Sequence, residues 1–108
     1  GQVEGGFQQG MGYALMENLQ FDEETGACLS ADFLDYKMPT AMEMPSNIET
    51  IFIDSNEPSG PYGGKSMSEM ALIVPAAAIA NAVYNAIGVR ITDLPITPEK
   101  VLRALGKL

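Results

Sequence analysis

Residues 70–88 read M-A-L-I-V-P-A-A-A-I-A-N-A-V-Y-N-A-I-G, and this stretch decides the helical half of the fold. Its apolar residues recur every three or four positions, which is the spacing of one helix face. Gly88 stands where glycine is favoured just past a helix end. Pro75 lies early in the stretch, so we expect a kink, or a short turn followed by a main helix that begins near Pro75. The periodic residues are Ile73, Ala76, Ala77, Ala80, Val83, Tyr84 and Ile87.

A second helix is predicted over residues 3–19. Apolar residues again recur every three or four positions there, from Val3 to Leu19. Glycines stand at positions 5, 6, 10 and 12, and each costs about 1 kcal/mol relative to alanine in a helix interior. Close backbone approach is the explanation, either by another element of the fold or by a ligand, and the spacing favours packing.

Strand signals lie between the two helices. Residues 21–29 carry a polar turn that predicts a hairpin, with Gly26 at a positive φ. The run I-E-T-I-F-I-D at 48–54 is rich in β-branched and aromatic residues and predicts a strand. A final helix is expected after Thr97 as N-cap, with Pro98 at its first position. We therefore predict one α+β domain over 1–108, with a small mixed sheet packed by helices in two layers.

Composition excludes several kinds of chemistry. The 108 residues contain no histidine and one cysteine, Cys28, so neither a zinc site of Cys and His nor a Ser-His-Asp unit is available. We expect no metal ligands from this chain. The net charge is −8, and eleven of the fourteen acidic residues lie in 1–60 beside a single base, Lys37. Phosphate binding needs Lys and Arg, so nucleic acid is not an expected partner. The acidic half is a solvated face or an interface.

No membrane partner and no secretory route are expected from the sequence. No uninterrupted apolar run reaches the ~18 residues of a membrane span. No basic segment precedes an apolar one in the manner of a signal peptide. We therefore expect a cytoplasmic protein. The sequence begins at Gly1 and not at methionine, so we interpret the chain as an excised segment, a processed product or a piece of something longer.

The glycine-rich loop before residue 70 holds the candidate functional residues. Residues 60–66 read G-P-Y-G-G-K-S, which suggests a phosphate-binding loop, but the glycine required five places before Gly64 is Ser59. Glu69 follows this loop and has two interpretations. In one, Ser66 and Glu69 form a capping box at a helix start. In the other, Glu69 is a general base held among apolar neighbours. The spacing alone favours the cap.

Five segments in order resemble the C-terminal part of the molybdenum-binding large subunit of the xanthine dehydrogenase and aldehyde oxidase family. They are G-Q-V-E-G-G-F-Q-Q-G-M-G at 1–12, D-Y-K-M-P-T-A at 35–41, G-P-Y-G-G-K-S-M-S-E at 60–69, A-A-I-A-N-A-V-Y-N-A-I-G at 77–88 and L-P-I-T-P-E-K-V-L at 94–102. The resemblance covers essentially the whole chain. It implies hydroxylation of an N-heterocycle or an aldehyde at a molybdenum held by a pyranopterin, with oxygen from water.

The resemblance also implies roles for single residues. Glu69 matches the glutamate that removes a proton from the molybdenum-bound hydroxyl, and Gln2 matches a glutamine that contacts the cofactor. Met67 would lie against the metal site, and the rest of the loop, including Lys65, Ser66 and Ser68, would contact the cofactor. Relatives usually have glycine at the two serine positions. Many xanthine-type enzymes also have two prolines after the glutamate, where this chain has Met70 and Ala71, which weakens the case for a purine substrate.

The family's subunit is several times longer than this chain, so the resemblance implies partners. The rest of the molybdenum-binding subunit would complete the cofactor site, and we expect the isolated chain to be inactive. Iron–sulfur clusters and FAD would belong to other domains or subunits, because one cysteine cannot hold a cluster. Two alternatives stay open: a non-catalytic interaction module without cofactor, favoured by the two loop serines, and a nucleotide-binding module that uses Lys65.

Overall fold

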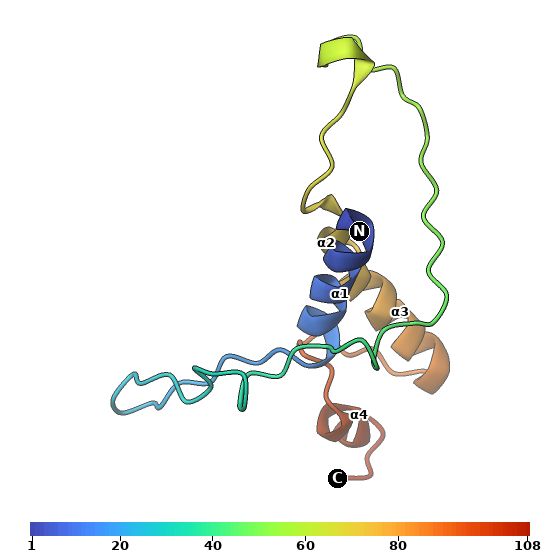
Figure 1. Cartoon of the computed structure of the whole chain (residues 1–108). Helices are drawn as coiled ribbons and strands as arrows, with labels where there is room; N and C mark the ends of the chain where they lie inside the picture. The colour runs from blue at the N-terminus through green and yellow to red at the C-terminus, as the bar shows by residue number, and fades with distance from the viewer.

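The computed structural model describes all 108 residues and contains four α-helices and one 3-10 turn. Helix α1 spans Gln2–Leu15, α2 spans Met70–Ile73, α3 spans Pro75–Ile87, and α4 spans Pro98–Ala104, while the 3-10 turn η1 covers Pro61–Gly63. Helices α2 and α3 pack on α1 at the centre of the molecule (Figure 1). The predicted helices are therefore confirmed, although α1 ends earlier than residue 19.

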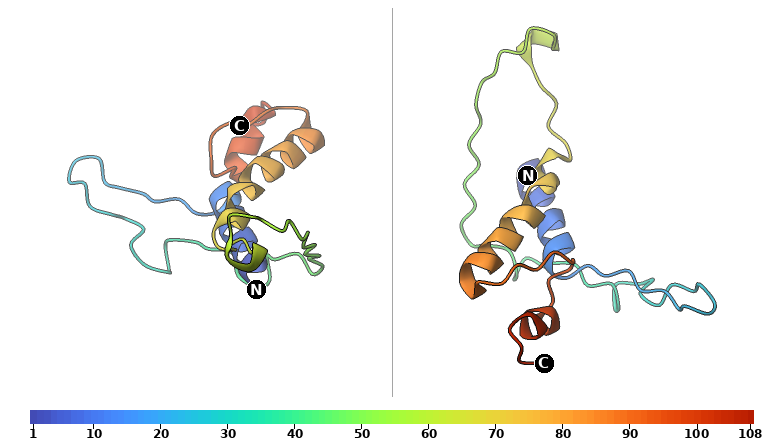
Figure 2. Two further views of the ribbon diagram at one scale, coloured as in Figure 1. Left: turned by 90° about the horizontal axis from the view of Figure 1, so that it is seen from above. Right: turned by 180° about the vertical axis from the view of Figure 1, so that it is seen from behind.

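Two long segments leave this helical centre. The first arm, residues 17–38, and the second arm, residues 46–69, project in different directions (Figure 1 and the right view of Figure 2). The radius of gyration is 17.6 Å, compared with about 13 Å for a compact chain of this length. Only 10 of 108 residues are buried, and the buried hydrophobic residues are Met11, Ala14 and Ile96. The chain has helices in contact but hardly any core.

The expected α+β fold with a small mixed sheet is wrong. The run 48–54 is extended along the second arm but pairs with no other strand, and Ile51, Phe52 and Ile53 are 76%, 77% and 87% exposed. A strand is stabilised by a neighbouring strand, and this chain provides none beside it. The only β-pairing is a single antiparallel bridge between Phe21 and Cys28.

The turn within the first arm forms as the sequence predicts. Asp22 Oδ1 accepts hydrogen bonds from the backbone amide and the hydroxyl of Thr25, each at 2.7 Å, and these bonds lower the pKa of Asp22. Gly26 has φ +70°. Two backbone hydrogen bonds, from Asp22 to Ala27 and from Leu29 to Gln20, close the hairpin. Local turn chemistry is thus sufficient here without a sheet.

The helix ends also follow the sequence. Helix α3 begins at Pro75 after a break at Val74, and Gly88 ends it with φ +72°. The Thr97 hydroxyl accepts from the backbone amide of Lys100 at 3.3 Å and caps α4, with Pro98 at its first position. The amide of Ile96 donates to the carbonyl of Ala14 at 2.7 Å, which ties the C-terminal segment to the end of α1.

The stretch Met70–Ile87 is long and apolar enough to cross a membrane by length and composition. Its mean hydropathy is 1.7, and 6% of it is buried. The stretch is not an uninterrupted apolar run, since it contains two asparagines and a tyrosine, but these residues leave its mean hydropathy high enough to meet the measure. The helix is broken at Val74, and its side toward α1 is in contact with that helix.

Candidate functional site: a polar cleft between two helices

Two of the α1 glycines let α2 and α3 approach closely. A Cβ added at Gly6 would lie 2.7 Å from the Cβ of Ala71, and one added at Gly10 would lie 2.8 Å from the carbonyl oxygen of Leu72. Real Cβ atoms do not come this near, so glycine is required at both positions. The packing explanation is therefore confirmed for these two glycines, and it repays their helix cost.

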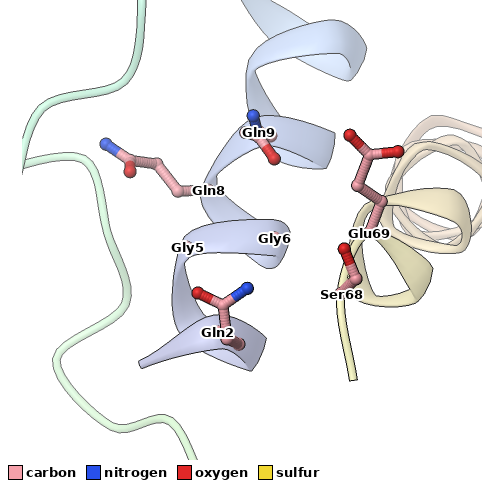
Figure 3. Close-up of a pocket in the computed structure, with 7 residues that line it drawn as sticks. All are labelled: Gln2, Gly5, Gly6, Gln8, Gln9, Ser68 and Glu69. Carbon is pink, nitrogen blue, oxygen red and sulfur yellow. The ribbon is translucent and has the colours of Figure 1, made fainter. Parts of the chain in front are cut away.

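Gly5 behaves differently from its neighbour. A Cβ built on Gly5 would meet nothing within 4 Å. Gly5 faces a cleft of about 320 Å³ between α1 and the start of α2, and none of the residues that line this cleft is hydrophobic. They are Gln2, Gly5, Gly6, Gln8, Gln9, Ser68 and Glu69 (Figure 3). The floor is glycine backbone, and the walls are amides, a hydroxyl and a carboxylate.

Glu69 is the N-cap residue of α2, and no side-chain hydrogen bond caps that helix. The capping box with Ser66 is therefore wrong, although the spacing favoured it. The Glu69 carboxylate makes no hydrogen bond or ion pair within the chain and projects beside Gln9 (Figure 3). A carboxylate that is not used by its own helix is free to act on a bound molecule.

The structure brings together three of the residues that the sequence singled out: Gln2, Ser68 and Glu69. The other three, Lys65, Ser66 and Met67, line a separate hollow of about 550 Å³ on the second arm, with Tyr62 and Phe52 among its walls. Met67 also lies beside Val3 and Met70 in a shallow apolar depression. The loop is therefore divided, with its last two residues facing the cleft and the residues before them facing the arm.

The sequence did not indicate Gln8 and Gln9 as cleft residues. Gln2, Gly5 or Gly6, and Gln9 are separated by three, four and seven positions, so they share one helix face, and this spacing was the available signal. Gln8 lies off this face, and no spacing in the sequence indicates it.

The glycine-rich loop cannot serve as a phosphate cradle. The amides of Gly60, Gly63 and Gly64 donate to carbonyls of the same loop, those of Glu57, Gly60 and Pro61, at 3.0–3.1 Å. Phosphate loops need such amides free. The loop also lies at the tip of the second arm, away from α1 (Figure 1). The nucleotide-binding alternative is not supported.

Comparison with known proteins identifies the family of this chain. The family model described as "Molybdopterin cofactor-binding domain" matches residues 1–45. The xanthine dehydrogenase molybdenum-binding subunit of Escherichia coli O157:H7 is 46% identical over 101 residues, which are 94% of this chain and 13% of that protein. The aldehyde oxidoreductase molybdenum-binding subunit of Escherichia coli K12 is 44% identical over 105 residues, 96% of this chain and 14% of that protein. The chain belongs to the xanthine dehydrogenase and aldehyde oxidoreductase family of molybdenum enzymes.

The family's solved structures share the open shape of this chain. The structure of quinoline 2-oxidoreductase from Pseudomonas putida 86 matches with a TM-score of 0.86 and 32% identity, over 98% of this chain and 14% of that one. The chain thus spans about one seventh of the length of these molybdenum enzymes. Because the match covers 98% of this chain, it includes both arms.

Proposed function

We propose that the chain supplies the catalytic base and one wall of the cofactor cleft in a molybdenum hydroxylase. The observation that carries the proposal is the position of Glu69, unpartnered at the edge of a wholly polar cleft that also contains Gln2. Family membership supports it, since the matched relatives are named as molybdenum-binding subunits of oxidoreductases. The activity belongs to the assembled subunit, by which we mean this chain together with the rest of the molybdenum-binding subunit.

The cleft residues fit a pyranopterin cofactor. Glutamine amides offer both donors and acceptors, which suits a ligand with polar ring edges. The open space above Gly5 allows a flat group to come close to the helix backbone, as glycine permits. The chain has no group of three His, Cys, Asp or Glu side chains that could hold a metal ion. Molybdenum would therefore take its ligands mainly from the cofactor, with Gln2 and Ser68 holding the cofactor's polar edge.

When bound, the cofactor supplies hydroxylation of an electrophilic carbon with oxygen derived from water. Glu69 accepts the proton of the attacking hydroxyl at its carboxylate oxygen. An ionised carboxylate suits this step because it is an acceptor only. The break between α2 and α3 leaves Glu69 at the start of a four-residue helix that is fixed against α1 through Ala71, so the base is held on a rigid contact.

The substrate class is an N-heterocycle or an aldehyde. The relatives differ in this respect, since their names specify xanthine, aldehyde and quinoline. The absence of the two prolines after Glu69 favours a substrate other than a purine. Iron–sulfur and flavin cofactors on partner subunits, and a cytoplasmic location, belong to the same proposal.

The test is Glu69→Gln in the assembled subunit, with molybdenum content and turnover measured on the same preparation. We expect unchanged molybdenum and turnover lowered by at least about a thousandfold, since an essential base is lost and the amide has the same shape. The matched control is Glu99→Gln on α4, which is exposed outside the cleft and should keep wild-type turnover. Near-normal turnover of Glu69→Gln would remove the base assignment.

The second candidate is an interaction module that has the fold without the chemistry. The exposed apolar side chains of both arms favour it, because such surfaces mark interaction sites. Elemental analysis separates the two candidates. About one molybdenum per assembled subunit supports the hydroxylase, and a metal-free assembly with all its partners supports the module.

A further inference from the structure

Gln8 and Gln9 are neighbours on α1, but only the side-chain amide of Gln8 makes a hydrogen bond. Gln8 Nε2 donates to the carbonyl oxygen of Pro39 at 2.6 Å and fixes the loop after the first arm to the helix. Gln9 is exposed, makes no hydrogen bond and lines the polar cleft. The side chain of Gln9 is therefore available for a task that Gln8 cannot perform.

Two close contacts set the position of Gln9 relative to α2. Gly6 contacts Ala71, two residues after Glu69, and Gly10 contacts Leu72 and Pro75. Gln9 lies between these two contacts on α1. The helices are in close contact at both glycines, since a Cβ would not fit at either. Gln9 therefore lies on the part of α1 that packs against the start of α2, where Glu69 stands.

Gln9 and Glu69 are also chemically complementary. The amide of Gln9 carries two donor hydrogens, and the carboxylate of Glu69 only accepts. Neither side chain makes a hydrogen bond or an ion pair within the chain, and Figure 3 shows them on the two walls of the same cleft, Gln9 on α1 and Glu69 at the start of α2. Hydrogen bonds from an amide to an ionised carboxylate are among the stronger ones in proteins.

We propose that Gln9 is a positioning residue for Glu69: its amide donates to the Glu69 carboxylate and holds it over the glycine floor on the side where Gln2 lies. The inference rests on the proposed role of Glu69 as base. Gln9 does not touch the reacting atoms in this role and acts only through Glu69. Without the amide, the carboxylate would rotate among several directions, and only a fraction of molecules would present it to the substrate.

The experiment uses Gln9→Met in the assembled subunit, because methionine is close to glutamine in length and has no donor. We expect unchanged molybdenum content, a KM within about twofold of wild type and a kcat lowered about tenfold, equivalent to about 1.4 kcal/mol in the transition state. Tyr13→Phe is the control, as it lies on the same helix outside the cleft. In the Glu69→Asp background, where the shorter carboxylate is already out of reach, Gln9→Met should change kcat by less than about twofold.

The outcomes separate this inference from the proposed function. A wild-type kcat in Gln9→Met together with an inactive Glu69→Gln overturns the positioning role and leaves the base in place. Loss of molybdenum in Gln9→Met also overturns it, since Gln9 would then hold the cofactor. Full turnover of Glu69→Gln overturns the proposed function itself. A crystal structure of the assembled, loaded subunit gives an independent measurement: a Gln9 Nε2 to Glu69 oxygen distance near 2.9 Å supports the role, and one beyond about 4 Å contradicts it.

Discussion

A Cβ placed on Gly6 would lie 2.7 Å from the Cβ of Ala71, so these two residues set how closely α1 and α2 can approach. Gly6→Ala should therefore lower the stability of the assembled subunit by about 1–3 kcal/mol, the usual cost of overpacking. Gly10→Ala should have the same effect, because its Cβ would meet Pro75 and Leu72. Urea unfolding followed by circular dichroism measures both.

Gly5→Ala is the matched comparison, since its Cβ would meet nothing within 4 Å. In cofactor-free protein it should leave stability unchanged or raise it by up to about 1 kcal/mol, through helix propensity alone. If Gly5→Ala and Gly6→Ala lowered the stability equally, contacts with the rest of the subunit, and not the contact with α2, would explain why glycine is needed.

The hydroxyl of Tyr36 donates to Glu17 Oε2 at 2.7 Å, and this bond with the nearby negative charge raises the pKa of Tyr36 to about 12. The folded-state pKa is higher than the ordinary value of 10, so this contribution to stability is complete below pH 10 and is lost as the pH rises toward 12. Ultraviolet titration of phenolate should show one of the four tyrosines ionising late, and Tyr36→Phe should remove that step. A late step that persists in Tyr36→Phe would assign it to another tyrosine.

Thr25 holds the pKa of Asp22 below its ordinary value through a hydroxyl and an amide hydrogen bond. Thr25→Val should move the Asp22 pKa upward, and Thr25→Ser, which keeps the hydroxyl, should not. Because the folded pKa is lowered, the turn is stabilised above pH 3.8 and loses this support as the pH falls further. Carboxyl carbon shifts in an NMR pH titration of the isolated chain measure the change. Equal titration of both variants would contradict the hydroxyl's role.

Ile51, Phe52 and Ile53 expose an unpaired, strand-forming segment in the isolated chain. Such segments promote aggregation, so Phe52→Ser with Ile53→Thr should reduce light scattering of the isolated chain at a given concentration. Met42→Thr is the control, because Met42 is equally exposed but lies outside that segment. In the assembled subunit the same double substitution should weaken assembly, since large apolar side chains gain about 1.5–3 kcal/mol each when buried. Unchanged assembly would show that this segment stays in solvent.

Elements fixed by local chemistry could be predicted from the sequence. The Pro75 break, the Gly88 end, the Thr97 cap and the Gly26 turn each depend on residues close together in the chain. The strand at 48–54 could not be predicted correctly, because pairing depends on a partner that this chain does not contain. The apolar, β-branched residues of this segment suit a strand that pairs with another part of a complete subunit. The strand that would pair with it is not in this chain.

The site was predictable to the same degree. Gln2, Ser68 and Glu69 line the same cleft, although they come from opposite ends of a 68-residue stretch, and their roles toward a cofactor stay predictions. Lys65, Ser66 and Met67 do not join them, because these three residues line a separate hollow on the second arm. The capping box failed for a related reason: spacing shows which residues can meet but not whether Ser66 is turned toward the helix.

The separation of α1 and α2 along the chain has a consequence for how the molecule folds. Residues 16–69 lie between them, so the Gly6–Ala71 contact forms only after a loop of more than fifty residues has closed. The entropic cost of closure grows only with the logarithm of loop length, but contacts this distant in sequence slow folding. The cleft is therefore among the last parts to form, and Glu69 reaches the side of α1 that carries Gln2 and Gln9 only after the chain between the two helices has closed.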